Sequence, residues 1–198
     1  NIPHRIFGGF KFYERVEIKN LISYLRLFVN PKDDVSFERI INFPKRGIGE
    51  GTIAKLREFG NGSLLENALS QEFKLSSLYK KFDSFVSPYN EISQKSKAVL
   101  SQFVEEVING FKIREAFNPS DEEDLNRLMN IDQFISSVKD FEELNPEGTL
   151  DDFLENITLS SDTDSIGEGG AVTIATVHAV KGLEFKVVFL VGVEEGIF

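Results

Sequence analysis

The C-terminal stretch Ala171–Phe198 constrains the fold most, because two apolar runs there flank a polar loop. The second run, Val187–Val191, reads VVFLV and has no polar alternation. Such a run is typical of a strand that is covered on both faces in a parallel α/β sheet. The chain begins with Asn rather than Met, and it stops within an apolar segment at Phe198. We therefore expect a piece of a larger protein that carries part of a sheet at its end.

The region between residues 18 and 157 shows the helical spacing of apolar residues instead. The stripes run over Ile18–Phe28, Phe37–Ile41, Ile53–Phe59, Val99–Ile108, Leu128–Val138 and Phe153–Ile157. Helix starts are predicted at Ser36, Ser63, Ser120 and Thr149, whose hydroxyls can accept the first free amides of a helix. Ile2–Phe7 predicts a short strand, and the polar, glycine-containing segment Ser160–Gly170 predicts a linker. The expected fold class is mainly α, with a helical domain flanked by short strands and a partial βαβ piece.

Composition excludes several kinds of site. The chain has 198 residues and no cysteine, so disulfides, thiolate zinc sites and cysteine nucleophiles are impossible. The imidazoles are limited to His4 and His178, and we predict no metal site. No run approaches the ~20 apolar residues that span a bilayer. The sequence therefore predicts no membrane partner and a cytoplasmic location.

The net charge of −10 is unevenly distributed. Residues 1–60 carry 11 Lys/Arg and seven Asp/Glu, whereas residues 61–198 carry 11 and 25. Exposed charges separated by more than about 8 Å are largely screened at physiological salt, so one face can be positive on an acidic protein. The distribution permits nucleic-acid binding at the N-terminal part without establishing it.

A first candidate site is the segment Pro44–Thr52, PKRGIGEGT, between two predicted helices. Its binding residues would be Lys45, Arg46, Gly47, Gly49 and Thr52. Glycines permit a close backbone approach, and two cations before a helix start suit phosphate groups. The alternative is an ordinary helix connection with two solvated cations.

A second candidate site is the loop between the two apolar runs at the C-terminal end. It brings Thr176, His178, Lys181 and Glu184 together after a predicted strand, where ligands of α/β sheets usually bind. The alternative is a surface ion pair between Lys181 and Glu184, with His178 as a local cap. The phosphate-binding pattern G-x-x-x-x-G-K-[ST] does not occur in the chain, so this loop has no phosphate cradle beside it.

A third candidate lies near the N-terminus, where Phe10, Phe12 and Tyr13 alternate with Lys11 and Arg15. Aromatic rings among cations can stack nucleic-acid bases and hold phosphates. The alternative is that the rings pack in a core or at a domain junction.

Three blocks in this order resemble the superfamily 1 DNA helicases of the UvrD/PcrA/Rep type. They are RIFGGFKFYERVEIKNLISYLRL, NFPKRGIGEGTIAKL and TIATVHAVKGLEFKVVFLVGVEEGIF. The resemblance implies a fragment of an ATP-dependent helicase of 3′ to 5′ polarity, in which a helical domain 2B interrupts the RecA-like domain 2A. Residues 1–17 and 169–198 would belong to 2A, and residues 18–168 to 2B.

The resemblance also implies roles for the candidate residues. Lys45 to Thr52 resembles the 2B hairpin that holds duplex DNA by its backbone. Thr176 and His178, with Lys181, would face single-stranded DNA, and Gly182 and Glu184 would lie towards the nucleotide ribose. ATP and Mg²⁺ would serve the parent enzyme. We expect no catalytic residue in this chain and no cofactor bound to it alone.

Partners follow from the same reading. Duplex and single-stranded DNA are expected, together with proteins of repair or replication. The apolar C-terminal strand would lack its neighbours in such a piece, so its open backbone groups favour pairing with another copy. The alternative function is a non-catalytic helical module that binds proteins through its acidic surface.

Overall fold

The computed structural model describes residues 4–7, 10–95, 97–162, 172–175 and 184–191. Helices dominate these ranges, which confirms the mainly α prediction. The elements are β1 (His4–Phe7), α1 (Phe10–Tyr13), α2 (Val16–Val29), α3 (Asp34–Ile40), α4 (Glu50–Arg57), α5 (Leu64–Leu69), α6 (Gln71–Lys74), α7 (Tyr79–Ser93), α8 (Leu100–Gly110), the 3₁₀ helix η1 (Ile113–Ala116), α9 (Glu122–Leu144), α10 (Leu150–Asp162) and β2 (Val172–Ala175).

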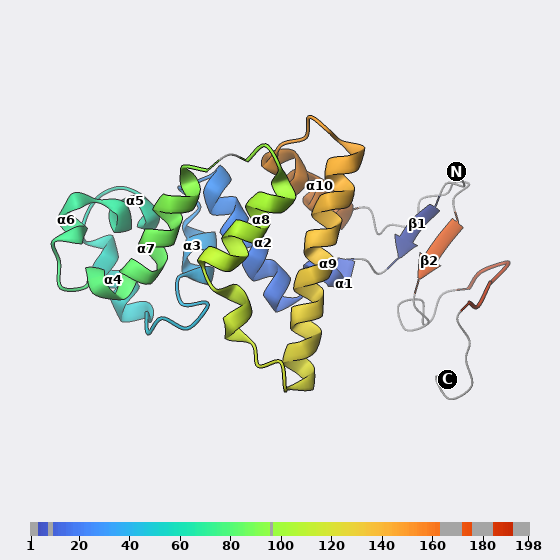
Figure 1. Cartoon of the computed structure of the whole chain (residues 1–198), viewed down its shortest axis with the longest axis horizontal. Helices are drawn as coiled ribbons and strands as arrows, with labels where there is room; N and C mark the ends of the chain where they lie inside the picture. Colours follow the sequence, from blue (N-terminus) through green and yellow to red (C-terminus); the bar gives the residue numbers. More distant parts are fainter. Residues whose placement is uncertain (1–3, 8–9, 96, 163–171, 176–183, 192–198) are drawn as a thin grey trace.

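Helix α2 lies at the centre of the helical block and packs against α3, α8, α9 and α10 (Figure 1). Ten of its 14 residues are buried, among them the polar Glu17, Asn20 and Ser23, so neighbours cover this helix on most of its sides. Its last carbonyls find partners from other elements, because Tyr89 Oη donates to Leu27 O at 3.1 Å and Lys97 Nζ donates to Phe28 O at 2.7 Å. These contacts satisfy carbonyl groups that have no donor within the helix.

An aromatic cluster fills the space between α2, α3, α7 and α8. Phe85 of α7 is fully buried, and four other aromatic rings lie around it. The neighbouring centroids lie at 5.2 Å for Phe111, 5.4 Å for Phe37, 6.2 Å for Tyr24 and 6.3 Å for Tyr89. Aromatic side chains bury large areas, so this cluster joins four helices into one core.

Two of the predicted helix starts are confirmed. Ser63 forms a complete capping box with Glu66 at the start of α5. At the start of α10, Thr149 Oγ1 accepts from Asp152 N at 3.2 Å. In both places a hydroxyl stands three residues before a free amide, as the pattern requires.

The other two predicted starts are wrong in position. Asp33 caps α3 instead of Ser36, because its carboxylate accepts from both Ser36 N and Ser36 Oγ, at 3.0 and 2.6 Å. Asp121 caps α9 instead of Ser120, and its Oδ1 accepts from Asp124 N at 2.9 Å. In each case an aspartate lies within three residues of the predicted serine, and its carboxylate accepts the hydrogen bond from a free amide of the first turn.

The segments that flank the helical block come together as a parallel pair of strands. Strand β1 pairs with β2 in a register that places Ile6 opposite Ile174, and the pair lies beside the helical block, beyond α9 and α10 (Figure 1). The helical residues 16–162 therefore form one long insertion between two adjacent strands. Helix α10 extends to Asp162, which removes the first residues from the predicted linker, and residues 163–170 lie outside the described ranges.

The predicted strand Val187–Val191 is not a strand in the described structure. Its five residues have irregular backbone and are between 57% and 85% exposed. An apolar strand requires neighbours that satisfy its backbone groups and cover its side chains. The sheet among the described residues consists of β1 and β2 alone, so this segment has no such neighbours.

Candidate nucleic-acid interface

The loop between α3 and α4, residues 41–49, is held in shape from within. Asn42 Oδ1 accepts from Arg46 N at 2.9 Å and from Ile48 N at 3.2 Å. Ile48 is buried in the core, so the far side of the loop is anchored as well. The chain between Asn42 and Ile48 therefore forms a turn of defined shape.

Glycines leave the outer face of this turn open. Gly47 has φ of +70°, a conformation that a residue with a Cβ rarely adopts. A Cβ added at Gly47, Gly49 or Gly51 would meet no atom within 4 Å. The open space on these residues lets a large ligand approach the backbone directly.

Helix α4 starts at this turn without a side-chain cap. Gly49 is the N-cap residue and has no capping hydrogen bond from a side chain, while its carbonyl accepts from Thr52 N and Ile53 N at 2.9 and 3.1 Å. Exposed amides at a helix start attract anions such as phosphate. Glu50 in the first turn opposes an anion there, because its carboxylate is negative and exposed.

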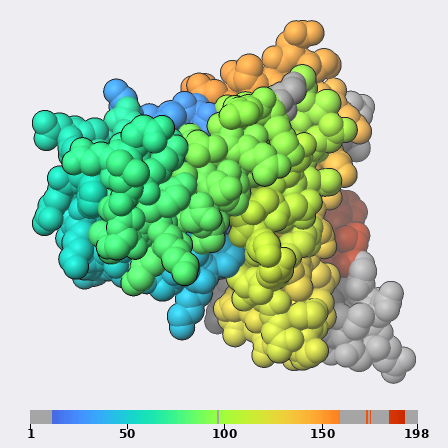
Figure 2. Space-filling model, turned by 60° about the vertical axis from the view of Figure 1, so that its left-hand side comes forward, coloured from blue at the N-terminus to red at the C-terminus, as the bar shows by residue number. Residues whose placement is uncertain are grey.

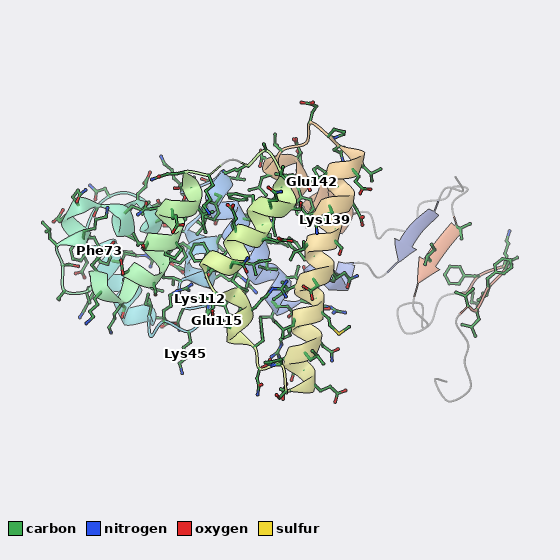
Figure 3. The ribbon with its side chains drawn as sticks, in the orientation of Figure 1. Lys45, Phe73, Lys112, Glu115, Lys139 and Glu142 are labelled. Carbon is green, nitrogen blue, oxygen red and sulfur yellow. The ribbon has the colours of Figure 1, made fainter. Side chains whose placement is uncertain are left out.

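Lys45 and Arg46 point in different directions. Lys45 is exposed and extends away from the ribbon (Figure 3), at a place where the segment around residue 45 projects from the surface (Figure 2). Arg46 instead turns inwards, and its Nη1 donates to the carbonyls of Ile40, Ile41 and Phe43 at 3.0, 3.2 and 2.8 Å. The sequence predicts DNA contact for both residues, and the structure presents only the lysine charge outwards at this turn.

The partner of Arg46 in the core is Tyr24, which the sequence analysis missed. Arg46 Nη2 donates to Tyr24 Oη at 2.9 Å, and Tyr24 Oη donates to Phe43 O. Burial raises the pKa of Tyr24 to about 12, and the positive charge of Arg46 and its hydrogen bond act in the opposite direction. Tyr24 therefore remains a neutral hydrogen-bonding group at physiological pH. Its position in the apolar stripe of α2 gives no signal of this role.

Most of the second candidate site lies outside the described residues. This applies to Thr176, His178, Lys181 and Gly182, whereas Glu184 is described and is exposed. Strand β2 ends at Ala175, so the predicted loop begins directly after a parallel strand. That location agrees with the usual placement of ligand loops in α/β sheets.

The part of the third candidate whose side chains are described, Phe12, Tyr13 and Arg15, contacts the helical core, and the side chains of Phe10 and Lys11 lie outside the description. Phe12 and Tyr13 are partly buried against it, with ring centroids 5.2 Å apart. Burial also raises the pKa of Tyr13. Arg15 Nη1 donates to Asn130 Oδ1 on α9. These contacts favour the packing alternative over base stacking for this segment.

Two further properties of the described ranges bear on the site. No helix there is both long and apolar enough to cross a membrane. Within the same ranges, no three His, Asp or Glu side chains come close enough to one another to hold a metal ion.

Comparison with known proteins gives consistent matches over the whole chain. The family model of the UvrD-like helicase C-terminal domain matches residues 1–198. The ATP-dependent DNA helicase PcrA of Staphylococcus epidermidis (strain ATCC 35984) is 38% identical over 207 residues. The PcrA proteins of Bacillus subtilis (strain 168) and Staphylococcus aureus (strain NCTC 8325) are 37% and 39% identical over 213 and 208 residues.

Each of these alignments covers 100% of this chain, and the chain spans 28% to 29% of the length of these relatives. The match of the family model from the first to the last residue agrees with the three sequence blocks that resemble UvrD/PcrA/Rep helicases. The chain therefore belongs to the UvrD-like helicase C-terminal domain family.

Proposed function

We propose that this chain is the duplex-binding part of an ATP-dependent 3′ to 5′ DNA helicase, with residues 18–168 as a 2B-type domain and residues 1–17 and 169–198 as parts of domain 2A. The turn at residues 41–49 carries the proposal. It combines an exposed lysine, open glycine backbone and an uncapped helix start on one projecting segment. Groups of these kinds contact the DNA backbone and do not read base sequence.

The distribution of charge also supports DNA contact at the 41–49 turn. Residues 140–155 contain seven acidic side chains and no basic one, and they lie at the end of α9 and in α10, away from α4 (Figure 1). A polyanion such as DNA is repelled by that end and attracted by a local positive charge. The acidic end would instead suit a basic protein partner, and it is the feature that favours the alternative of a protein-interaction module.

We expect Lys45→Ala to weaken duplex binding equally for all sequences. Each phosphate neutralised by a protein cation contributes about −0.9 to the slope of log K against log salt. Loss of Lys45 should therefore make the slope shallower by about one. Fluorescence anisotropy with two unrelated labelled duplexes, at several salt concentrations, measures both quantities.

Lys139→Ala is the matched control. Lys139 is an exposed lysine on α9, well apart from Lys45 (Figure 3), and its ion pair with Glu105 at 3.8 Å is exposed, so its loss has little effect on stability. The control should keep the wild-type slope. Duplex affinity that does not depend on salt in the wild-type chain would reject the proposed function and favour the protein-interaction module.

The nucleotide belongs to the parent enzyme in this proposal. Gly182 and Glu184 would lie towards its ribose, and Thr176, His178 and Lys181 towards single-stranded DNA. Phosphoryl transfer requires a phosphate cradle, Mg²⁺ and an arginine near one γ-phosphate, and the cradle pattern does not occur in these 198 residues. We therefore expect no ATP turnover from this chain alone. A coupled ATPase assay with single-stranded DNA tests this, and DNA-stimulated turnover by the pure chain would contradict it.

A further inference from the structure

The guanidinium of Arg46 binds at the C-terminal end of α3. Its Nη1 donates to the carbonyls of Ile40 and Ile41, the last residue of the helix and its C-cap. It also donates to Phe43 O in the following turn. Carbonyls at a helix end lack donors within the helix. One side chain thus ties the end of α3 to the turn that carries Lys45.

The rest of the guanidinium lies against the core, and Arg46 as a whole is half-buried. Its Cζ atom lies 5.5 Å from the ring centroid of Phe85 and 6.0 Å from that of Phe111, and Nη2 donates to Tyr24 Oη. A planar, forked cation can bind several acceptors and stack on rings at the same time, whereas a lysine ammonium cannot reproduce this arrangement. The two terminal nitrogens of Arg46 are therefore engaged with protein acceptors.

The neighbouring backbone depends on this position. Arg46 N is also one of the two amides that Asn42 Oδ1 accepts. The side chain and the main chain of Arg46 thus both fix the turn from within. Gly47, with its positive φ, follows at once, and Gly49 then starts α4. Loss of the guanidinium contacts would release the residues whose backbone is open to a ligand.

We propose that Arg46 is a positioning residue for duplex binding, which holds the 41–49 turn so that Lys45 and the glycine backbone face the DNA, and that its own charge does not contact phosphate. This inference rests on the proposed function and assigns a division of roles within that site. Lys45 supplies the charge, and Arg46 supplies the shape.

The test compares Arg46→Lys, Arg46→Ala and Lys45→Ala in the full 198-residue chain. Duplex affinity is measured against salt, and amide hydrogen exchange is measured over residues 47–52. We expect Arg46→Lys, which keeps the charge, to lose about tenfold in affinity because the turn is no longer preorganised. The salt slope should stay at the wild-type value, and exchange over residues 47–52 should become faster. Lys45→Ala should show the opposite pattern, with a shallower slope and unchanged exchange.

A direct phosphate contact by Arg46 would give different results. Arg46→Lys would then bind within about twofold of wild type, and Arg46→Ala would make the slope shallower by about one. Exchange over residues 47–52 would not change in either variant. That set of results would overturn the inference.

Val138→Ala controls for a general loss of stability. Val138 is fully buried in α9 and makes no part of the turn, so this variant lowers stability without reshaping the site. At a temperature well below its unfolding transition it should bind duplex as wild type does. A comparable loss of affinity in Val138→Ala would show that the effect of Arg46→Lys is general, and the inference would fail.

Failure of the proposed function gives a separate result. A wild-type chain without salt-dependent duplex binding rejects that function whatever Arg46 does. Hydrogen exchange then still shows whether Arg46 holds the turn in shape: faster exchange over residues 47–52 in Arg46→Lys means that it does, and unchanged exchange rejects the inference on its own ground.

Discussion

Phe85→Ala is expected to destabilise the protein by about 3–5 kcal/mol, the range for loss of a fully buried phenylalanine. Phe85 lies among aromatic rings from α2, α3 and its own helix and that of Phe111, the C-cap residue of α8, so no single neighbour can move to fill the cavity. Arg46 also rests on its ring. Urea unfolding followed by circular dichroism gives the change in the free energy of unfolding.

Phe141→Ala is the control for Phe85→Ala. Phe141 is only partly buried and meets one ring, that of Phe153, at a centroid distance of 5.3 Å. Water can fill the space that its ring leaves, so the expected loss is about 1–2 kcal/mol. A loss below about 1.5 kcal/mol for Phe85→Ala would mean that the aromatic cluster repacks and is not the common core of the four helices.

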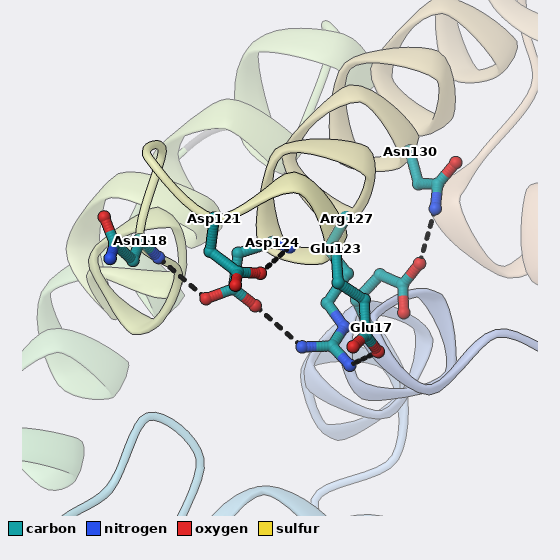
Figure 4. A network of polar contacts seen from close by, with 7 residues as sticks. All are labelled: Glu17, Asn118, Asp121, Glu123, Asp124, Arg127 and Asn130. Carbon is teal, nitrogen blue, oxygen red and sulfur yellow. Dashed lines mark hydrogen bonds and ion pairs between the residues drawn. The ribbon is translucent and has the colours of Figure 1, made fainter.

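Asn130→Leu is expected to cost about 2–3 kcal/mol, because it leaves a buried carboxylate without its donor and also removes the acceptor of Arg15 Nη1. Asn130 of α9 and Glu17 of α2 are both buried, and Asn130 Nδ2 donates to Glu17 Oε1 at 2.6 Å. Figure 4 shows this contact beside the ion pairs that Arg127 forms with Glu123 and Asp124. The side-chain amide thus connects the first turn of α2 to the middle of α9.

The double variant Glu17→Met with Asn130→Leu shows how much of that loss comes from the unsatisfied carboxylate of Glu17. Removing both polar partners leaves no buried charge unsatisfied, so the double variant should be more stable than Asn130→Leu alone. Denaturant unfolding of the two single variants and the double variant closes the cycle. Additive losses in the double variant would show that Glu17 and Asn130 do not stabilise the protein as a pair.

Local sequence signals were sufficient for several of the helices, but they did not predict α1, α6 or α7. Apolar spacing predicted α2, α8 and α9, because a helix that packs on a core must place apolar residues on one face. Ser63 and Thr149 were predicted as caps, since capping involves residues only three apart. For α3 and α9 the same rule failed in position, because Asp33 and Asp121 cap these helices in place of the nearby serines.

The sheet could not be predicted from the apolar run alone. VVFLV at Val187–Val191 has the composition of a buried strand, but a strand forms only where other strands satisfy its backbone. The strands that do pair in the described structure are β1 and β2. The whole helical block separates them in the sequence. Their pairing depends on how that block folds, and no local pattern contains this information.

The sequence by itself determined that this chain is mainly helical and that a glycine-rich basic turn precedes α4. Only the tertiary structure decided that Lys45 and Arg46 differ. The two cations are adjacent in sequence, and nothing local separates them. The direction of Arg46 is set by carbonyls at the end of α3, by Tyr24 and by the rings of Phe85 and Phe111. These acceptors and rings come from α2, α3 and α7, from the C-cap residue of α8 and from the turn itself, so they exist as a site only after the chain has folded.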